Sequence, residues 1–202
     1  MIAVIDYGVG NLFSLTSSLK AVGAEAVVTS DSRLIKKADK ILLPGVGAFE
    51  DAIAKLKATG LDKLICEEVM AGKKILGICL GMQMLFEKSY EYGIHNGLSL
   101  LKGEIIGMDG TIPENLKIPH IGWNALHIKK QHPIFKYVNE NDSVYFVHSY
   151  YATGCEDSLL ASAEYGKELT AAVALGNIAG TQFHPEKSGK VGLGILKAFS
   201  EW

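Results

Sequence analysis

The segment KKILGICLGMQMLFE, residues 73–87, places a cysteine at the end of an apolar run. Ile75–Ile78 is typical of a buried strand and helix-forming residues follow, so Cys79 should lie at a sharp strand-to-helix turn. Gly77 and Gly81 leave room for such a turn, as in a nucleophile elbow with cysteine in place of serine. Unpaired N–H groups at a helix start favour a thiolate. Alone, GICLG fits a nucleophile and a buried structural cysteine equally well.

A cysteine nucleophile needs a base, and among six histidines His184 has the best setting, in GTQFHPEKS. Pro185 biases His184 toward an extended backbone, along which side chains two residues apart face the same way. Glu186 should therefore lie beside the imidazole, where a carboxylate fixes the tautomer and stabilises the imidazolium. The alternative for this segment is a plain turn with an exposed glutamate. His120 and His148 favour structural hydrogen bonding over catalysis.

An acyl-transfer site also needs N–H donors for the oxyanion that develops on the substrate. PGVGAF, residues 44–49, offers the backbone of Val46 and Gly47 at a strand end, and Leu80 directly follows the candidate nucleophile. Alone, PGVG is more readily explained as a plain turn. It lacks the glycine spacing and the Lys-Ser/Thr pair of a phosphate loop. If it is the oxyanion segment, a peptide flip within GVG could switch an N–H toward or away from the site.

Strand and helix patterns alternate through the first 90 residues and must position these groups. Strand patterns lie at 2–5, 26–29, 41–43 and 75–78, and helix patterns at 12–22, 48–57, 61–71 and 82–87. Such alternation predicts βαβ units and a parallel sheet, whose functional groups collect beyond the carboxyl ends of the strands. Short β-like runs follow between 98 and 177, then a final helix over 192–202. We therefore expect an α/β fold in one domain, 1–202: an open, mostly parallel sheet flanked by helices, with antiparallel additions in the second half.

The composition excludes several classes of protein. With 202 residues, 48% of them hydrophobic and 21% charged, the chain should be globular, and a net charge of −2 gives no basic surface for nucleic acid or an anionic membrane. The apolar run 75–86 is too short to span a bilayer, and the start shows no signal peptide. Cys66, Cys79 and Cys155 are too widely spaced for a disulfide framework or a zinc site. We expect a cytoplasmic protein without metal or cofactor.

Three segments in this order resemble the class I glutamine amidotransferases. They are PGVGAF at 44–49, GICLGMQ at 77–83 and FHPEKS at 183–188. The resemblance implies hydrolysis of glutamine to glutamate and ammonia. It assigns Cys79 as the nucleophile, His184 as the general base and acid, and Glu186 as the residue that orients it.

The resemblance also implies contacts to the bound glutamine. Gln83 lies where the family has a glutamine contact, and Glu91 matches a glutamate that binds the amino group, although a solvated helix-end charge explains Glu91 equally well. Ser149 and Tyr150 could hold the α-carboxylate through hydroxyl or backbone donors. Gly47 completes this set from the oxyanion segment.

Within the family, three further segments are similar to the glutaminase subunits of imidazole glycerol phosphate synthases. They are VIDYGVGNLFSL near the start, PHIGWN at 119–124 and YFVHSYYA at 145–152. This resemblance implies a heterodimer with a (β/α)₈-barrel cyclase subunit, which receives the ammonia in histidine biosynthesis and stimulates a low glutaminase activity. Trp123, Tyr145 and Lys187 would face the cyclase. Strand packing is the alternative for Tyr145, and a solvated charge for Lys187.

Other interpretations of the same residues lead elsewhere. The chain could supply ammonia to another pathway, such as sugar amination, or serve as an inactive binding subunit, which the intact Cys79, His184 and Glu186 disfavour. A cysteine protease or esterase of similar topology is disfavoured by PGVG and Gln83.

Overall fold

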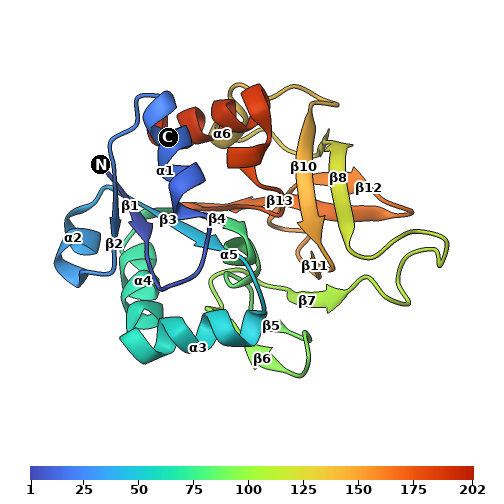
Figure 1. Ribbon diagram of the computed structural model, residues 1–202, viewed down its shortest axis with the longest axis horizontal. Helices are drawn as coiled ribbons and strands as arrows, with labels where there is room; N and C mark the ends of the chain where they lie inside the picture. The colour runs from blue at the N-terminus through green and yellow to red at the C-terminus, as the bar shows by residue number, and fades with distance from the viewer.

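An eight-stranded sheet forms the centre of the computed structural model, which describes residues 1–202 (Figure 1). In spatial order its strands are β2 (Ala26–Thr29), β1 (Ile2–Ile5), β3 (Lys40–Gly45), β4 (Lys74–Cys79), β14 (Ile178–Thr181), β13 (Glu168–Leu175), β12 (Leu159–Glu164) and β9 (His127–Ile128). The first five run parallel, whereas β13, β12 and β9 are added antiparallel. This confirms the predicted α/β class with a mostly parallel sheet.

Two smaller sheets come from the second half of the chain. One pairs β10 (Ser143–His148) with β8 (His120–Ala125), and the other has the order β11 (Tyr150–Thr153), β7 (Glu104–Gly107), β5 (Lys88–Ser89) and β6 (His95–Asn96). Figure 1 shows β8 and β10 at the end of the molecule away from β1 and β2. Sequence patterns did not predict β8.

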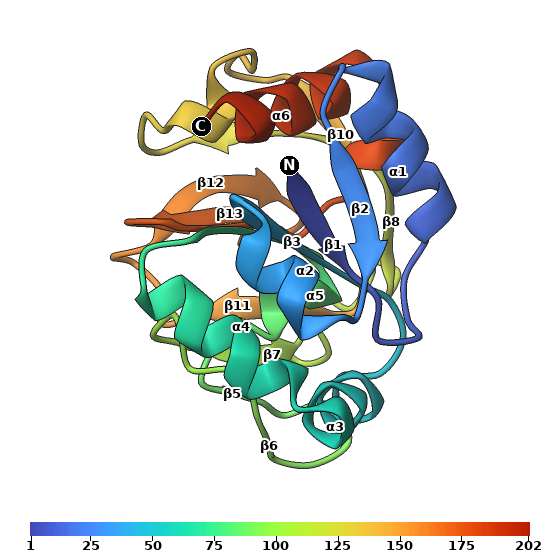
Figure 2. The ribbon, with the colours of Figure 1, turned by 90° about the vertical axis from the view of Figure 1, so that its left-hand side faces the viewer.

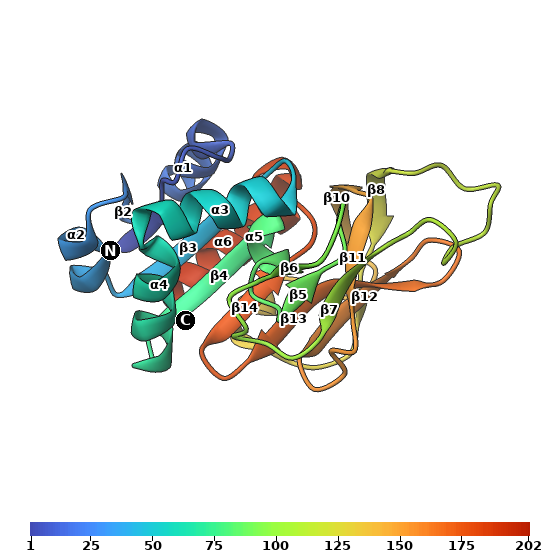
Figure 3. The same cartoon turned by 90° about the horizontal axis from the view of Figure 1, so that it is seen from below.

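Helices cover both faces of the large sheet. They are α1 (Leu12–Ala21), α2 (Ser32–Lys37), α3 (Phe49–Thr59), α4 (Leu61–Met70), α5 (Leu80–Gln83) and α6 (Gly189–Glu201), with short 3₁₀ turns η1 (Pro133–Phe135) and η2 (Pro185–Lys187). Figures 2 and 3 show α1 and α6 on one face, and α3 and α4 on the other. None of the helices has the length and apolar character that crossing a bilayer requires.

Alternation along the central strands fills the two cores. On β3, Ile41 and Leu43 pack in the cluster that contains α3 and α4, whereas Leu42 packs with α1 and α6. Period-two side-chain direction explains this division, and burial on both faces explains why the strand reads as a continuous apolar run. Because five neighbouring strands run parallel, their carboxyl ends lie at one edge of the sheet, where the turns after β3 and β4 also lie.

The helix after β4 is shorter than the sequence predicted. α5 is a single turn, and residues 84–87, expected to continue it, form turns instead. Their carbonyl groups accept hydrogen bonds from the segment 97–101, including Leu98 N–H to Met84 O at 2.8 Å. Hydrogen bonds to the segment 97–101 therefore replace the i to i−4 hydrogen bonds of the helix that the local sequence favours.

Candidate active site

Cys79 occupies the predicted turn between β4 and α5 in a strained backbone conformation, with φ of 55° and ψ of −112°. Such a left-handed conformation costs a non-glycine residue about 1–3 kcal/mol and persists only where the surroundings enforce it. Here the surroundings are backbone. A Cβ atom on Gly81 would overlap the Leu43 carbonyl, and one on Gly77 would lie 2.7 Å from the Gly81 carbonyl oxygen. Glycines thus let the main chain close tightly around the nucleophile position.

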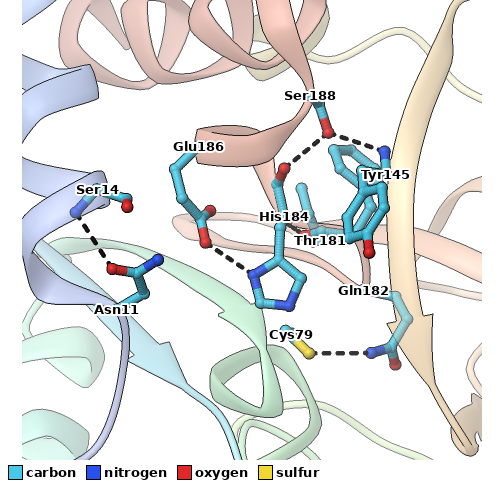
Figure 4. A network of polar contacts seen from close by, with 10 residues as sticks. Asn11, Ser14, Cys79, Tyr145, Thr181, Gln182, His184, Glu186 and Ser188 are labelled. Carbon is cyan, nitrogen blue, oxygen red and sulfur yellow. Dashed lines mark hydrogen bonds and ion pairs between the residues drawn. The ribbon is translucent and has the colours of Figure 1, made fainter. Parts of the chain in front are cut away.

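The imidazole of His184 and the carboxylate of Glu186 form a buried pair. His184 Nδ1 lies 2.8 Å from Glu186 Oε1, and both side chains are less than 5% exposed (Figure 4). His184 has the predicted extended backbone, with φ of −99° and ψ of 100°, but Pro185–Lys187 then forms a 3₁₀ turn, so the contact does not run along one continuous extended segment. Glu186 Oε2 is buried and bonded to no protein group.

The backbone that carries the base is attached to β10. His184 N–H donates to Tyr145 O at 3.0 Å, Ser188 Oγ donates to His184 O at 2.7 Å, and Tyr145 N–H donates to Ser188 Oγ at 3.0 Å. Figure 4 shows the two bonds of Ser188 on the opposite side of His184 from Cys79. No local pattern in the sequence singles out Ser188, whose role depends on the spatial neighbour Tyr145.

The base and the sulfur interact electrostatically. Burial lowers the pKa of His184, but hydrogen bonds and charge interactions with Cys79 and Glu186 outweigh it and raise this pKa to about 9. At neutral pH the site therefore favours an imidazolium beside the sulfur. Tyr7, which the sequence analysis did not identify, lies nearby and donates to Pro44 O at 2.8 Å. Burial, and then the charge of Cys79, raise the pKa of Tyr7.

A cavity of about 410 Å³ opens in front of Cys79 and His184. Its lining includes nine other residues singled out in the sequence: Val46, Gly47, Leu80, Gln83, Glu91, His148, Ser149, Tyr150 and Lys187. Glu186, Trp123 and Tyr145 do not line it. The volume lies within the range of small-molecule sites, and the lining mixes backbone, amide, hydroxyl and charged groups.

The backbone donors expected for an oxyanion are present at the cavity. The N–H groups of Val46 and Gly47 donate to no other protein group, and Gly47 has a φ of +93°. Leu80 opens α5, where the first N–H groups have no partner within the helix. The cavity that Cys79 lines is thus also lined by three residues whose backbone N–H groups could bind an acceptor.

Glu91 reaches the cavity while binding the start of α3. Phe49 N–H donates to Glu91 Oε2 at 2.6 Å, which satisfies a backbone donor two residues after Gly47. Burial raises the pKa of Glu91, and the Phe49 N–H opposes that rise. A ligand ammonium here would share this carboxylate with α3.

Gln83 belongs to a buried amide network that the sequence analysis did not foresee. Its Nε2 donates to Tyr150 O at 3.1 Å and to Gln182 Oε1 at 3.0 Å, and Gln182 Nε2 donates to Cys79 Sγ at 3.7 Å. The available signal for Gln182 was a polar residue at an apolar strand end, two residues before His184.

His148, which also lines the cavity, and His120 continue this network toward β8. Tyr150 O also lies 2.8 Å from His148 Nδ1, which must carry the proton, and His148 Nε2 then accepts from His120 Nδ1 at 3.1 Å. Asn124 Nδ2 lies 3.4 Å from the other nitrogen of His120. Burial lowers the pKa of His120 to about 4, and burial chiefly lowers that of His148 to about 3. Both imidazoles are neutral and serve as hydrogen-bonding groups.

Trp123, Tyr145 and Lys187 form one cluster at the rim. Trp123 and Tyr145 are paired across β8 and β10 with ring centroids 6.1 Å apart, and Lys187 Nζ lies 5.8 Å from the Tyr145 ring. Ile121 and Trp123 are each 58% exposed on the outer face of β8, whose inner face carries His120 and Asn124. Alternation along PHIGWN thus separates surface anchors from the buried network.

Comparison with known proteins supports this description. The family model described as glutamine amidotransferase class-I matches residues 3–200. Two curated relatives, each named imidazole glycerol phosphate synthase subunit HisH, come from Caldanaerobacter subterraneus subsp. tengcongensis (52% identical) and Oceanobacillus iheyensis (50% identical). Each alignment covers 100% of this chain and 98% of the relative.

Solved structures show the same fold at low sequence identity. One described as a glutamine amidotransferase has a TM-score of 0.75 at 16% identity, covering 96% of this chain and 95% of that one. Another, PurLQS from Thermotoga maritima, has a TM-score of 0.73 at 19% identity, covering 98% and 95%. The match over nearly the whole chain and the identity of about half its residues show that the chain belongs to the class-I glutamine amidotransferases and, within them, to the HisH subunits of imidazole glycerol phosphate synthase.

Proposed function

We propose that the protein hydrolyses glutamine to glutamate and ammonia with Cys79 as nucleophile, His184 as general base and acid, and Glu186 as the orienting carboxylate. The observation that carries this proposal is the strained Cys79 turn beside a base whose Nδ1 is bonded to Glu186 at 2.8 Å. The sulfur, the imidazole and the free N–H groups all border one cavity, as acyl transfer requires.

The chemistry divides into two acyl transfers. The Cys79 thiolate attacks the carboxamide carbon, and the N–H groups of Gly47 and Leu80, with Val46 as a further donor, stabilise the oxyanion. The His184 imidazolium protonates the departing ammonia, and the neutral imidazole then activates water against the thioester. The raised pKa of His184, about 9, suits the first of these steps, because the proton is already on the base when the amide bond breaks.

Glutamine recognition is assigned to the remaining cavity residues. Glu91 supplies the only carboxylate that lines the cavity and is proposed to bind the α-ammonium. Ser149 and Tyr150 follow β10 and are proposed to bind the α-carboxylate. Gln83 is proposed to contact the substrate directly, since it borders the cavity next to Cys79.

We further propose that the ammonia passes to a (β/α)₈-barrel cyclase subunit, which forms imidazole glycerol phosphate and aminoimidazole carboxamide ribotide in histidine biosynthesis. The relatives' printed name describes one subunit of a synthase, which supports a second subunit. Trp123, Tyr145 and Lys187 support a docking face, because an exposed tryptophan flanked by an aromatic ring and a cation is typical of interface anchors. The reducing cytoplasm would keep Cys79 a free thiol, as it is in the structure.

Co-purification with the candidate cyclase, followed by measurement of glutamate release, tests the proposal. We expect slow release by the chain alone and faster release when the cyclase and its nucleotide ligand are present. Cys79→Ala should bind the cyclase and release no glutamate. Glutamate release by the Cys79→Ala complex at the wild-type rate would refute the nucleophile assignment, and failure to co-purify would refute the partner.

A further inference from the structure

Gln182 is a buried polar residue to which the mechanism above gives no part. Its side chain is fully buried, directly after β14 and two residues before His184. The amide nitrogen donates to Cys79 Sγ at 3.7 Å, and the amide oxygen accepts from Gln83 Nε2 at 3.0 Å (Figure 4 shows the bond to the sulfur). One amide therefore touches both the proposed nucleophile and a cavity-lining residue.

The sulfur determines the direction of these hydrogen bonds. A thiolate only accepts, so Gln182 must turn its NH₂ group toward Cys79 and its oxygen toward Gln83. The NH₂ group of Gln83 then donates to Gln182 Oε1 and to Tyr150 O, which uses both of its hydrogens. The carbonyl oxygen of Gln83 receives no protein hydrogen bond and remains as the polar group that this residue offers to the cavity.

We propose that Gln182 is a positioning residue for glutamine hydrolysis. It stabilises the Cys79 thiolate by N–H donation, and through the same amide it holds Gln83 with its oxygen toward an N–H donor of the substrate. The inference rests on the role proposed above for Cys79. One neutral side chain thus stabilises the charged form of the nucleophile and determines which polar atom of Gln83 faces the substrate.

The other side chains around the sulfur do not duplicate this donor. His184 interacts with Cys79 and loses its donor when it is deprotonated. The Tyr7 hydroxyl donates to Pro44 O instead. Glu91 and Lys187 border the same cavity as charged groups. Gln182 is therefore the side chain whose hydrogen bond to the sulfur does not depend on its own titration.

Alkylation of Cys79 by iodoacetamide as a function of pH, followed by mass spectrometry, tests the proposal in the full-length chain with Gln182→Met. Because the variant loses a hydrogen bond to the charged sulfur, we expect half-maximal alkylation to move up by about one to two pH units. In the complex, the KM for glutamine should rise and kcat should fall, with kcat/KM reduced about tenfold or more. Cys79→Ala gives the background from the other two cysteines.

Thr181→Val is the matched control. Thr181 is the neighbouring fully buried polar residue, and its Oγ1 donates to Phe183 O at 3.1 Å and makes no hydrogen bond to the sulfur. We expect it to lower stability about as much as Gln182→Met and to leave the alkylation profile unchanged. If Gln182→Met does not fold, Gln182→Asn retracts the amide by one methylene and should shift the profile in the same direction.

The outcomes separate this inference from the proposed function. A folded Gln182 variant whose alkylation profile and KM coincide with those of Thr181→Val would overturn the inference, while an inactive Cys79→Ala would leave the nucleophile assignment intact. If Cys79→Ala still released glutamate, the nucleophile assignment would fail, and the role of Gln182 with it.

Discussion

The single hydrogen bond between Glu186 and His184 makes Glu186→Gln an informative perturbation of the proposed triad. Nδ1 and Oε1 are 2.8 Å apart in a buried pair, and Oε2 has no protein partner that could disperse the charge. The side chain introduced by Glu186→Gln keeps the shape and the acceptor oxygen of the carboxylate and removes only its charge. The variant therefore tests electrostatic stabilisation of the imidazolium separately from its orientation.

The expected size of the effect follows from the pKa of His184. Its rise from 6.5 to about 9 corresponds to about 3 kcal/mol in favour of the imidazolium, and a hydrogen bond to a charged group contributes about 1.5–3 kcal/mol of such an effect. Glu186→Gln should thus lower this pKa by about one to two units and reduce kcat/KM roughly 10- to 100-fold. Because the pKa is raised in the folded protein, the associated stability is complete below about pH 6.5 and lost as the pH rises through about 9.

Glutamate release by the complex, measured from about pH 6 to about pH 10, provides the assay. We expect the alkaline decline of the wild type near pH 9 and a decline at lower pH in Glu186→Gln. Glu186→Asp keeps the charge on a shorter side chain and should retain an alkaline limb closer to that of the wild type. If Glu186→Gln loses activity with an alkaline limb at the wild-type pH, the carboxylate does not hold the imidazolium, and the reasoning is refuted.

Three other substitutions test the turn, the oxyanion segment and the docking cluster. Gly81→Ala places a Cβ against the Leu43 carbonyl and should lower the free energy of unfolding, measured by urea denaturation, by about 3 kcal/mol or more. Gly60→Ala is the control, because Gly60 has a left-handed backbone with open space around it, and it should lower this free energy by about 1 kcal/mol. Gly47→Ala strains a φ of +93° without a clash, so it should change the ratio of stimulated to basal glutamate release, and an unaltered ratio would contradict a flip of this peptide. Trp123→Ala should weaken binding to the cyclase at least about 30-fold and leave the melting temperature unchanged. If calorimetric titration shows that the variant binds the cyclase with the wild-type affinity, Trp123 is not an anchor.

Strong apolar patterns in the sequence predicted the large sheet well. The strands 2–5 and 26–29 and most of α1 follow the expected ranges, because buried strands and amphipathic helices leave regular signals. α2 was missed because it is short and buries a single residue, Ile35, so no repeat of apolar residues marks it.

The site shows where local sequence stops being sufficient. His184 has the extended backbone that the sequence predicted, yet its contact with Glu186 forms across a 3₁₀ turn that Pro185 opens. Proline fits the first position of a helical turn as well as an extended segment, and the fold decided between them. Gln182 and Ser188 acquire their contacts only from strands far away in the sequence, and no local pattern encodes those neighbours.

Two neutral histidines, one on β8 and one on β10, lie between the exposed face of β8 and the nucleophile. With pKa values of about 4 and about 3, His120 and His148 carry no charge across the physiological range. The hydrogen-bonded path from Asn124 on β8 to Tyr150 therefore contains no charged group. It can transmit a displacement of the strand, but not a change of charge. A partner that binds at Trp123 would therefore act on the site around Cys79 by displacing atoms. The ratio of stimulated to basal glutamate release should not change with pH where the charges of Cys79 and His184 are constant.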